Sequence, residues 1–170
     1  MADGVFGVEI VTPEQSLLAG GATSVVLATS EGALTVLDGH TPLVGDVVPG
    51  EVRVEQSDGA LRRLAVHGGF VQIDTSPDAA AGLAEGDGPL PGLSTRVTLL
   101  AGVAELAEEI DVDRARTALE AAEARVAELG GTGRTPAEGE DADPELVEAE
   151  SAVRRAQVRL EAVDAATATA

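Results

Sequence analysis

The hydrophobic pattern of this chain changes its period once, and the change divides the 170 residues into two parts. Up to residue 101, short apolar runs are interrupted by Gly, Pro, Asp and Ser, which is the pattern of short β-strands. The runs at 23–28, 33–37, 51–56, 61–66, 70–73 and 96–100 fit it, with a hairpin turn at Ser57, Asp58 and Gly59. We therefore expect an all-β antiparallel sandwich of about ten strands over residues 1–104.

From Asp111 onward, apolar residues recur at spacings of three and four, which is the spacing of one face of an α-helix. Asp111 is a candidate N-cap, Gly130 and Gly131 end the first helix, and Asp143 with Pro144 opens a second. The apolar seams are Val112, Ala115, Leu119, Ala122, Val126 and Leu129, and then Leu146, Ala149, Val153, Ala156, Leu160 and Val163. Residues 105–170 are thus predicted to form an antiparallel α-helical hairpin. Its Ala-rich seams bury little apolar area, so the hairpin can leave its docking place.

Three segments lack a sustained period. Residues 74–95 are rich in Ala, Gly and Pro and are predicted to form a flexible surface insert. Residues 130–143 are an acidic, Gly-rich linker between the two helices, and the tail at 165–170 is expected to fray.

Composition excludes several classes of function. The net charge of −19 disfavours binding to nucleic acid or to an anionic lipid surface, and the lack of Trp and Tyr removes platforms for stacking bases. All 11 basic residues are Arg, which excludes a Walker-type phosphate loop, and the lack of Cys excludes thiolate metal sites. No apolar run is long enough to span a membrane or to act as a signal peptide, so we expect no direct membrane insertion and a cytoplasmic location.

The segment from Ser30 to Leu43 is a strand, a tight turn and a return led by Pro42. It contains no catalytic constellation and is interpreted as a docking surface. His40 is a single His with no second His or Cys near it, so it is interpreted as a contact residue and not as a metal ligand. The sequence His67-Gly68-Gly69-Phe70 is similar to the oxyanion loop of lipases, but no Gly-x-Ser-x-Gly motif accompanies it. We therefore predict no catalytic residues, and two glycines at a bulge or a chain crossing.

Together with Val8–Glu14 and His67–Ile73, the segment Ser30–Leu43 closely resembles the amino-terminal domain of the epsilon subunit of F-type ATP synthases, of the bacterial, high-GC kind. The resemblance covers most of residues 5–129 and 146–164. It implies a non-catalytic subunit of the central stalk of a proton-translocating complex, peripheral at the cytoplasmic face of the cell membrane. Its implied partners are the gamma subunit, the membrane rotor (c) ring and the alpha/beta hexamer, and no cofactor is required.

The same resemblance assigns two surfaces. The loop Gly39, His40, Thr41, Pro42 and Leu43 would face the rotor ring. The hairpin would restrain ATP hydrolysis by exchanging a folded state, docked on the sandwich, for an extended state along gamma.

A regulatory ATP site is implied as well. Glu105 precedes an Ile-Asp-x-x-Arg-Ala motif, and two arginines follow on the second helix; the matching residues are Glu105, Ile110, Asp111, Arg114, Ala115, Arg155 and Arg159. Arg155 and Arg159 have no acid three or four positions away, so an anion must meet them: a phosphate, carboxylates such as Asp111 and Glu123, or acids of a partner subunit. A further arginine of the family appears here as Ala121.

Two other functions compete with this interpretation. One is a stand-alone adapter that recruits a soluble partner through its helical hairpin, and the other is a small esterase. Co-purification with alpha, beta and gamma subunits would distinguish the epsilon interpretation from the adapter. An activity screen with ester substrates would test the esterase.

Overall fold

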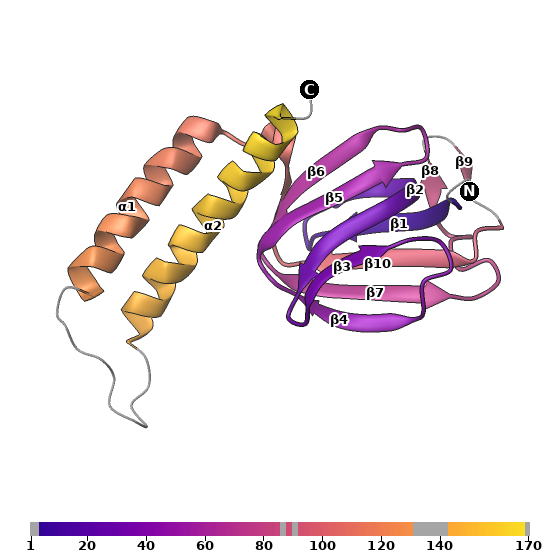
Figure 1. The fold of residues 1–170 in the computed structure, drawn as a ribbon, viewed down its shortest axis with the longest axis horizontal. Coiled ribbons are helices and arrows are strands. Elements are labelled where there is room, and N and C mark those ends of the chain that lie inside the picture. The colour runs from indigo at the N-terminus through magenta and orange to yellow at the C-terminus, as the bar shows by residue number, and fades with distance from the viewer. Residues whose placement is uncertain (1–3, 86–87, 90–91, 131–142, 169–170) are drawn as a thin grey trace.

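The computed structural model describes residues 4–85, 88–89, 92–130 and 143–168. The strands are β1 (Phe6–Val11), β2 (Ser16–Thr29), β3 (Gly32–Val36), β4 (Leu43–Val47), β5 (Gly50–Gln56), β6 (Leu61–Val66), β7 (Gly69–Thr75), β8 (Ala84–Glu85), β9 (Gly88–Pro89), β10 (Thr95–Ala101) and β11 (Ala104–Leu106). A 3-10 turn, η1 (Ala107–Glu109), leads to helices α1 (Val112–Gly130) and α2 (Pro144–Thr167). The strands form a sandwich and the helices a hairpin beside it (Figure 1), which confirms the predicted fold class. No helix within these described ranges is long and apolar enough to cross a membrane.

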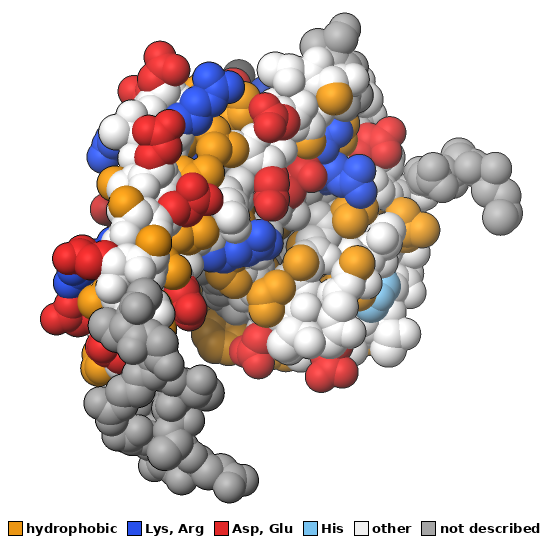
Figure 2. All heavy atoms as spheres, turned by 60° about the vertical axis from the view of Figure 1, so that its left-hand side comes forward, with side chains coloured by type: hydrophobic (Ala, Val, Ile, Leu, Met, Phe, Trp, Pro, Cys, Tyr) orange, Lys and Arg blue, Asp and Glu red, His pale blue; other side chains and the backbone are white. Residues whose placement is uncertain are grey.

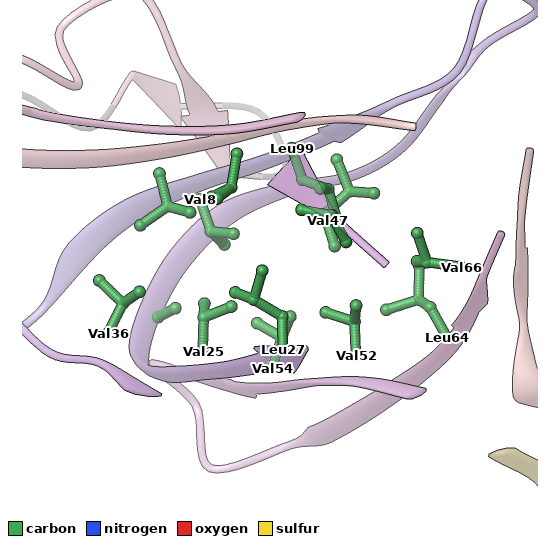
Figure 3. Close-up of a cluster of buried hydrophobic side chains, with 14 of the residues drawn as sticks. Val8, Val25, Leu27, Val36, Val47, Val52, Val54, Leu64, Val66 and Leu99 are labelled. Carbon is green, nitrogen blue, oxygen red and sulfur yellow. The ribbon is translucent and has the colours of Figure 1, made fainter. Parts of the chain in front are cut away.

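The core of the sandwich lies between two layers of strands, because alternate residues of each strand point inward. Figure 3 shows Val25, Val36, Val52, Val54 and Leu64 facing Val8, Val47 and Leu99. The core is built from Val, Leu, Ile and Ala, as the composition predicts, with Phe6 as its one aromatic side chain in the described residues.

Strand pairing departs from the antiparallel prediction at one place. Strand β1 pairs in parallel with β10, with Val8 opposite Val97, whereas its other edge pairs antiparallel with the long strand β2. The two strands of the parallel pair come from the two ends of the sandwich sequence, so no local turn signal marks the pairing.

The insert is more structured than the sequence predicts. Ala80 and Leu83 are buried, and both lie against Gly7 of β1, where a Cβ atom would come within 2.5 Å of the Ala80 Cβ. The base of the insert is closed by a backbone bond from the Ser76 amide to the Ser94 carbonyl. The description of residues 74–95 as a flexible surface loop is therefore wrong for these parts, because the missing side chain of Gly7 leaves room for them.

The hairpin matches its prediction closely. The Asp111 side chain caps α1, the Asp143 side chain caps α2, and both predicted seams face each other between the helices. Most of the predicted linker 130–143 lies outside the described residues. Helix α2 continues to Thr167, past the residue 165 from which fraying is predicted, and Ala166 packs against the apolar cluster between α2 and the sandwich.

An apolar cluster and a strand pairing are among the contacts that join the hairpin to the sandwich. Val158 and Ala162 of α2 are buried with Ala65 of β6 and Ala107 of η1. Strand β11 pairs with β6, with Glu105 opposite Ala65, so the predicted boundary between residues 104 and 105 cuts through a strand of the sheet. The sandwich ends after Leu106, because the Leu106 side chain also packs on the core.

Candidate functional site

A hollow of about 310 Å³ lies between the start of α1, β11 and α2. Six of the seven residues predicted for the ATP site line this hollow, together with two residues that were not predicted, Glu109 and Ala118. The full lining is Glu105, Glu109, Ile110, Asp111, Arg114, Ala115, Ala118 and Arg159. The motif residues are held there by the cap of α1, in which the Asp111 Oδ1 accepts a bond of 3.0 Å from the Arg114 amide. Ile110 also packs against the docking cluster, so the hollow and the hairpin contact share a wall.

Glu105 and Arg159 form a two-pronged ion pair at one side of the hollow. The Arg159 Nε donates to both Glu105 oxygens at 3.0 Å, and its Nη2 donates to Oε1 at 2.6 Å. The hydrogen bond from Arg159 lowers the pKa of the Glu105 carboxyl, and the same bond raises the pKa of Arg159. This pair joins the sheet to α2, and we call it the latch.

Arg155 does not line the hollow. Its guanidinium donates to the Glu148 carboxylate and to the Ser151 hydroxyl, both at 2.7 Å, on its own helix. The carboxylates that meet the two arginines are therefore Glu148 and Glu105, and not the suggested Asp111 and Glu123. Glu148 lies two helical turns before Arg155, outside the spacing of three or four that the sequence argument considered.

The charge of the hollow is mixed. Three carboxylates, those of Glu105, Glu109 and Asp111, face two guanidiniums, those of Arg114 and Arg159. Arg159 is engaged by Glu105, whereas the Arg114 side chain makes no ion pair within the described ranges. Arg114 is therefore the cation of this hollow that is available to an added anion.

His67 lies beside the latch, at the end of β6. Both of its ring nitrogens are buried, and neither has a hydrogen-bond partner among the described residues. Burial, and after it the charge of Arg159, lowers the pKa of His67 from 6.5 to about 4. A buried imidazole with a pKa near 4 is a weak base that a substrate cannot reach, which weighs against the esterase interpretation.

Gly68 and Gly69, which follow His67, lie at a chain crossing, one of the two arrangements predicted for them. Gly69 has a φ of 147°, and a Cβ atom there would lie 2.1 Å from the Leu100 carbonyl oxygen.

The predicted docking loop, residues 39–43, lies at the end of the sandwich opposite the hairpin (Figure 1). Gly39 occupies the left-handed region with a φ of 77°, which favours glycine at this turn. The His40 Nδ1 donates to the Thr41 carbonyl at 2.8 Å. Pro42 and Leu43 are exposed, so the loop offers an accessible surface.

Two further surfaces were not identified from the sequence. Phe70 and Leu100 are opposite neighbours on β7 and β10, and they are 57% and 51% exposed. They border a hollow of about 580 Å³ that also includes Val11 and Pro13. On α2, Val158 and Ala162 face the sandwich, and the Arg154 Nη2 donates to the Pro49 carbonyl at 2.9 Å. The spacing of four from Val158 through Ala162 to Ala166 would have indicated this second apolar stripe.

The outer surface of the hairpin carries mixed charges with acids in excess (Figure 2). Apolar side chains lie among them along the helices, and no extended basic patch is visible on this face. The excess of acids on this face is in line with the net charge of −19.

Both parts of the chain match known protein families. The family model described as the ATP synthase delta/epsilon chain beta-sandwich domain matches residues 5–77, and the model of the long alpha-helix domain matches residues 108–164. An ATP synthase epsilon chain of Streptomyces griseus is 36% identical over 92% of this chain and 93% of its own length. Another, of Thermobifida fusca, is 43% identical over 68% of this chain and 73% of its own.

A chain in the cryo-EM structure of the Euglena gracilis mitochondrial ATP synthase shares the fold, with a TM-score of 0.64 at 21% identity, over 96% of this chain and 81% of that one. The sandwich and the helical hairpin are thus matched separately by family models and together by full-length relatives. This chain belongs to the ATP synthase delta/epsilon family.

Proposed function

We propose that this protein is the non-catalytic epsilon chain of a proton-translocating ATP synthase, lying in the central stalk between the rotor ring and the gamma shaft. Its relatives are named epsilon chains, and the fold neighbours come from structures whose titles name the F1 part, the c-ring and the central stalk. In this proposal the subunit is peripheral at the cytoplasmic face of the membrane, with the docking loop toward the rotor ring. Co-purification of alpha, beta and gamma subunits with the tagged chain tests it, and capture of none of them would favour the adapter function.

The apolar outer face of β7 and β10 is the surface that we assign to the gamma shaft. Phe70 and Leu100 are more than half exposed there, and large exposed apolar neighbours mark contact surfaces. Phe70→Ser should reduce recovery of gamma with the tagged subunit. Thr98→Ser, on the same strand as Leu100, is the matched control. Equal recovery of gamma with both variants would contradict the assignment.

The hairpin is proposed to restrain ATP hydrolysis by leaving its dock. The observation that supports this role is the weakness of the docking contact, in which one Val and three Ala side chains, the latch and the hydrogen bond from Arg154 to the Pro49 carbonyl hold the two parts together. Fully burying a Val contributes about 1.5–3 kcal/mol, and an Ala contributes less. A contact of a few kcal/mol is in the range that a partner subunit can exchange for another contact.

The experiment is ATP hydrolysis by the assembled complex with and without the residues after Leu106. This truncation keeps all the sandwich strands, including β11, and removes both helices. Faster hydrolysis by the truncated complex, with unchanged assembly, is the expected result. An equal rate in the two complexes would refute the inhibitory role and leave the stalk role standing.

Regulatory ATP is proposed to bind in the hollow between β11 and the two helices. Support comes from the gathering there of six of the seven predicted residues, and from Arg114, whose guanidinium has no ion-pair partner within the described residues. By linkage, ATP that binds only the docked hairpin must stabilise docking.

Calorimetry on the isolated subunit tests the nucleotide proposal. Arg114→Ala should weaken ATP binding by about 1.5–3 kcal/mol, the range for a hydrogen bond to a charged group. Arg116→Ala, two residues along α1 and outside the hollow, is the matched control. No heat of binding at millimolar ATP would refute the nucleotide site.

A further inference from the structure

The docking loop is fastened to the two ends of the insert. Thr75, the last residue of β7, and Thr95, the first of β10, are opposite partners in the sheet, and the insert runs between them. The Thr75 hydroxyl donates to the His40 carbonyl at 2.7 Å. The Thr95 hydroxyl donates to the Asp38 carboxylate at 3.0 Å and accepts from the Gly39 amide at 2.9 Å.

These three bonds hold Asp38, Gly39 and His40 against the ends of β7 and β10. Asp38 and Gly39 are exposed, and Gly39 is in a left-handed conformation. Thr95, in contrast, is fully buried, and a buried hydroxyl is retained in a core only where it is hydrogen-bonded. A Val of the same shape would satisfy the packing, so the hydroxyl has a role other than filling space.

We propose that Thr75 and Thr95 are positioning residues that hold the docking loop in the conformation that it presents toward the rotor. The insert and the loop are then both attached to these two residues. The proposal rests on the proposed function of that loop. It also links the insert to the loop: a displacement of the described ends of the insert, residues 76–85 and 92–94, is transmitted through Thr75 and Thr95 to His40 and Gly39. These ends of the insert and the loop lie together at the end of the sandwich away from the hairpin (Figure 1).

The first measurement is amide hydrogen exchange in the isolated full chain. Thr95→Val removes the acceptor of the Gly39 amide, and exchange at Gly39 should become about tenfold faster, as expected for a lost hydrogen bond. Thr95→Ser keeps the hydroxyl and should restore protection. Thr98→Val is the matched control, because Thr98 lies on the same strand and its side chain makes no hydrogen bond within the described residues. Unchanged exchange at Gly39 in Thr95→Val would overturn the proposal.

The second measurement is proton pumping per ATP hydrolysed in vesicles that contain the assembled complex. Thr95→Val and Thr75→Val should both lose pumping toward the level of His40→Ala with Leu43→Ala, whereas Thr95→Ser should pump normally. Thr75 is only partly buried, so its variant keeps the test available if Thr95→Val folds poorly.

The outcomes separate the two proposals. Normal pumping by a Thr95→Val complex with fast Gly39 exchange, beside impaired His40→Ala with Leu43→Ala, would overturn the positioning role alone. Normal pumping by the His40→Ala with Leu43→Ala complex would overturn the rotor-docking function, and with it the purpose assigned to Thr75 and Thr95.

Discussion

Removing the charge of Arg159 should release the hairpin from the sandwich. Arg159 makes three donor contacts to Glu105, and no other ion pair between α2 and the sheet occurs in the described residues. Arg159→Met keeps the length and the apolar part of the side chain while removing the guanidinium. The helix itself should remain, because Met is a good helix former.

The size of the effect follows from the exposure of the pair. Hydrogen bonds to charged groups contribute about 1.5–3 kcal/mol when buried, and exposed pairs contribute less than about 1 kcal/mol. Arg159 and Glu105 are 26% and 34% exposed, between these limits. We expect a coupling of about 1.5 kcal/mol, which shifts the docking equilibrium about tenfold. Beside a contact otherwise made of Ala and Val side chains and one hydrogen bond from Arg154, this is a large share of the docking free energy.

Energy transfer between two dyes measures the docking equilibrium directly. The chain contains no Cys, so cysteines introduced at exposed Asp58 in the β5–β6 turn and at exposed Glu150 on α2 label these two sites alone. Arg159→Met should lower the transfer efficiency. Arg155→Met is the matched control, since Arg155 pairs only with residues of its own helix.

A double-mutant cycle completes the experiment. Glu105→Gln with Arg159→Met should be no more open than Arg159→Met alone, because the second change removes a partner that is already lost. Additive opening by the two changes, or transfer in Arg159→Met equal to that of the unaltered chain, would show that the latch does not hold the hairpin.

Three further predictions follow from the structure. His67 has its pKa lowered from 6.5 to about 4 when docked, so the undocked state binds the proton more readily; docking should weaken as the pH falls from 6.5 to about 4. Burial is the larger cause of this shift and the charges of Arg159 and Arg155 on α2 are a further one, so undocking recovers only part of it. We expect an effect of about 1 kcal/mol, and dye transfer that stays as pH-dependent in His67→Leu as in the parent would contradict it. A chain truncated after Leu106 should remain soluble and unfold cooperatively, because the buried strands close their core without the helices; insolubility or a non-cooperative melt would refute this. His40→Ala with Leu43→Ala should leave the melting temperature within about 2 °C of the parent's, since both side chains lie at the surface, and a larger loss would show that the loop is part of the core.

The sequence was most informative where structure depends on local pattern. Strand β6 begins and ends at the predicted residues 61 and 66, and Asp143 with Pro144 opens α2 as expected. These features follow from alternation and capping, which involve neighbours in the chain.

Long-range partners could not be predicted in the same way. Glu105 and Arg159 were both selected as site residues, but 54 positions separate them, and no spacing rule connects a strand to a helix at that distance. The burial of Leu83 over Gly7 is a similar case, because it depends on a missing side chain on another strand. Six of the seven predicted site residues do meet in one hollow, and Arg155 is absent because an acid two turns away holds it.

The pairing of β1 along both of its edges has a mechanical consequence. Through β1, β10, β7, β4 and β2 the hydrogen-bonded strands return to their starting point and form a closed circuit, completed by the single pair Thr29 and Val47. A closed circuit leaves no free edge at which one strand can peel away from the next. Torque applied at one end of the sandwich would then be shared among five strands, and the single pair Thr29 and Val47 is where we expect the circuit to yield first.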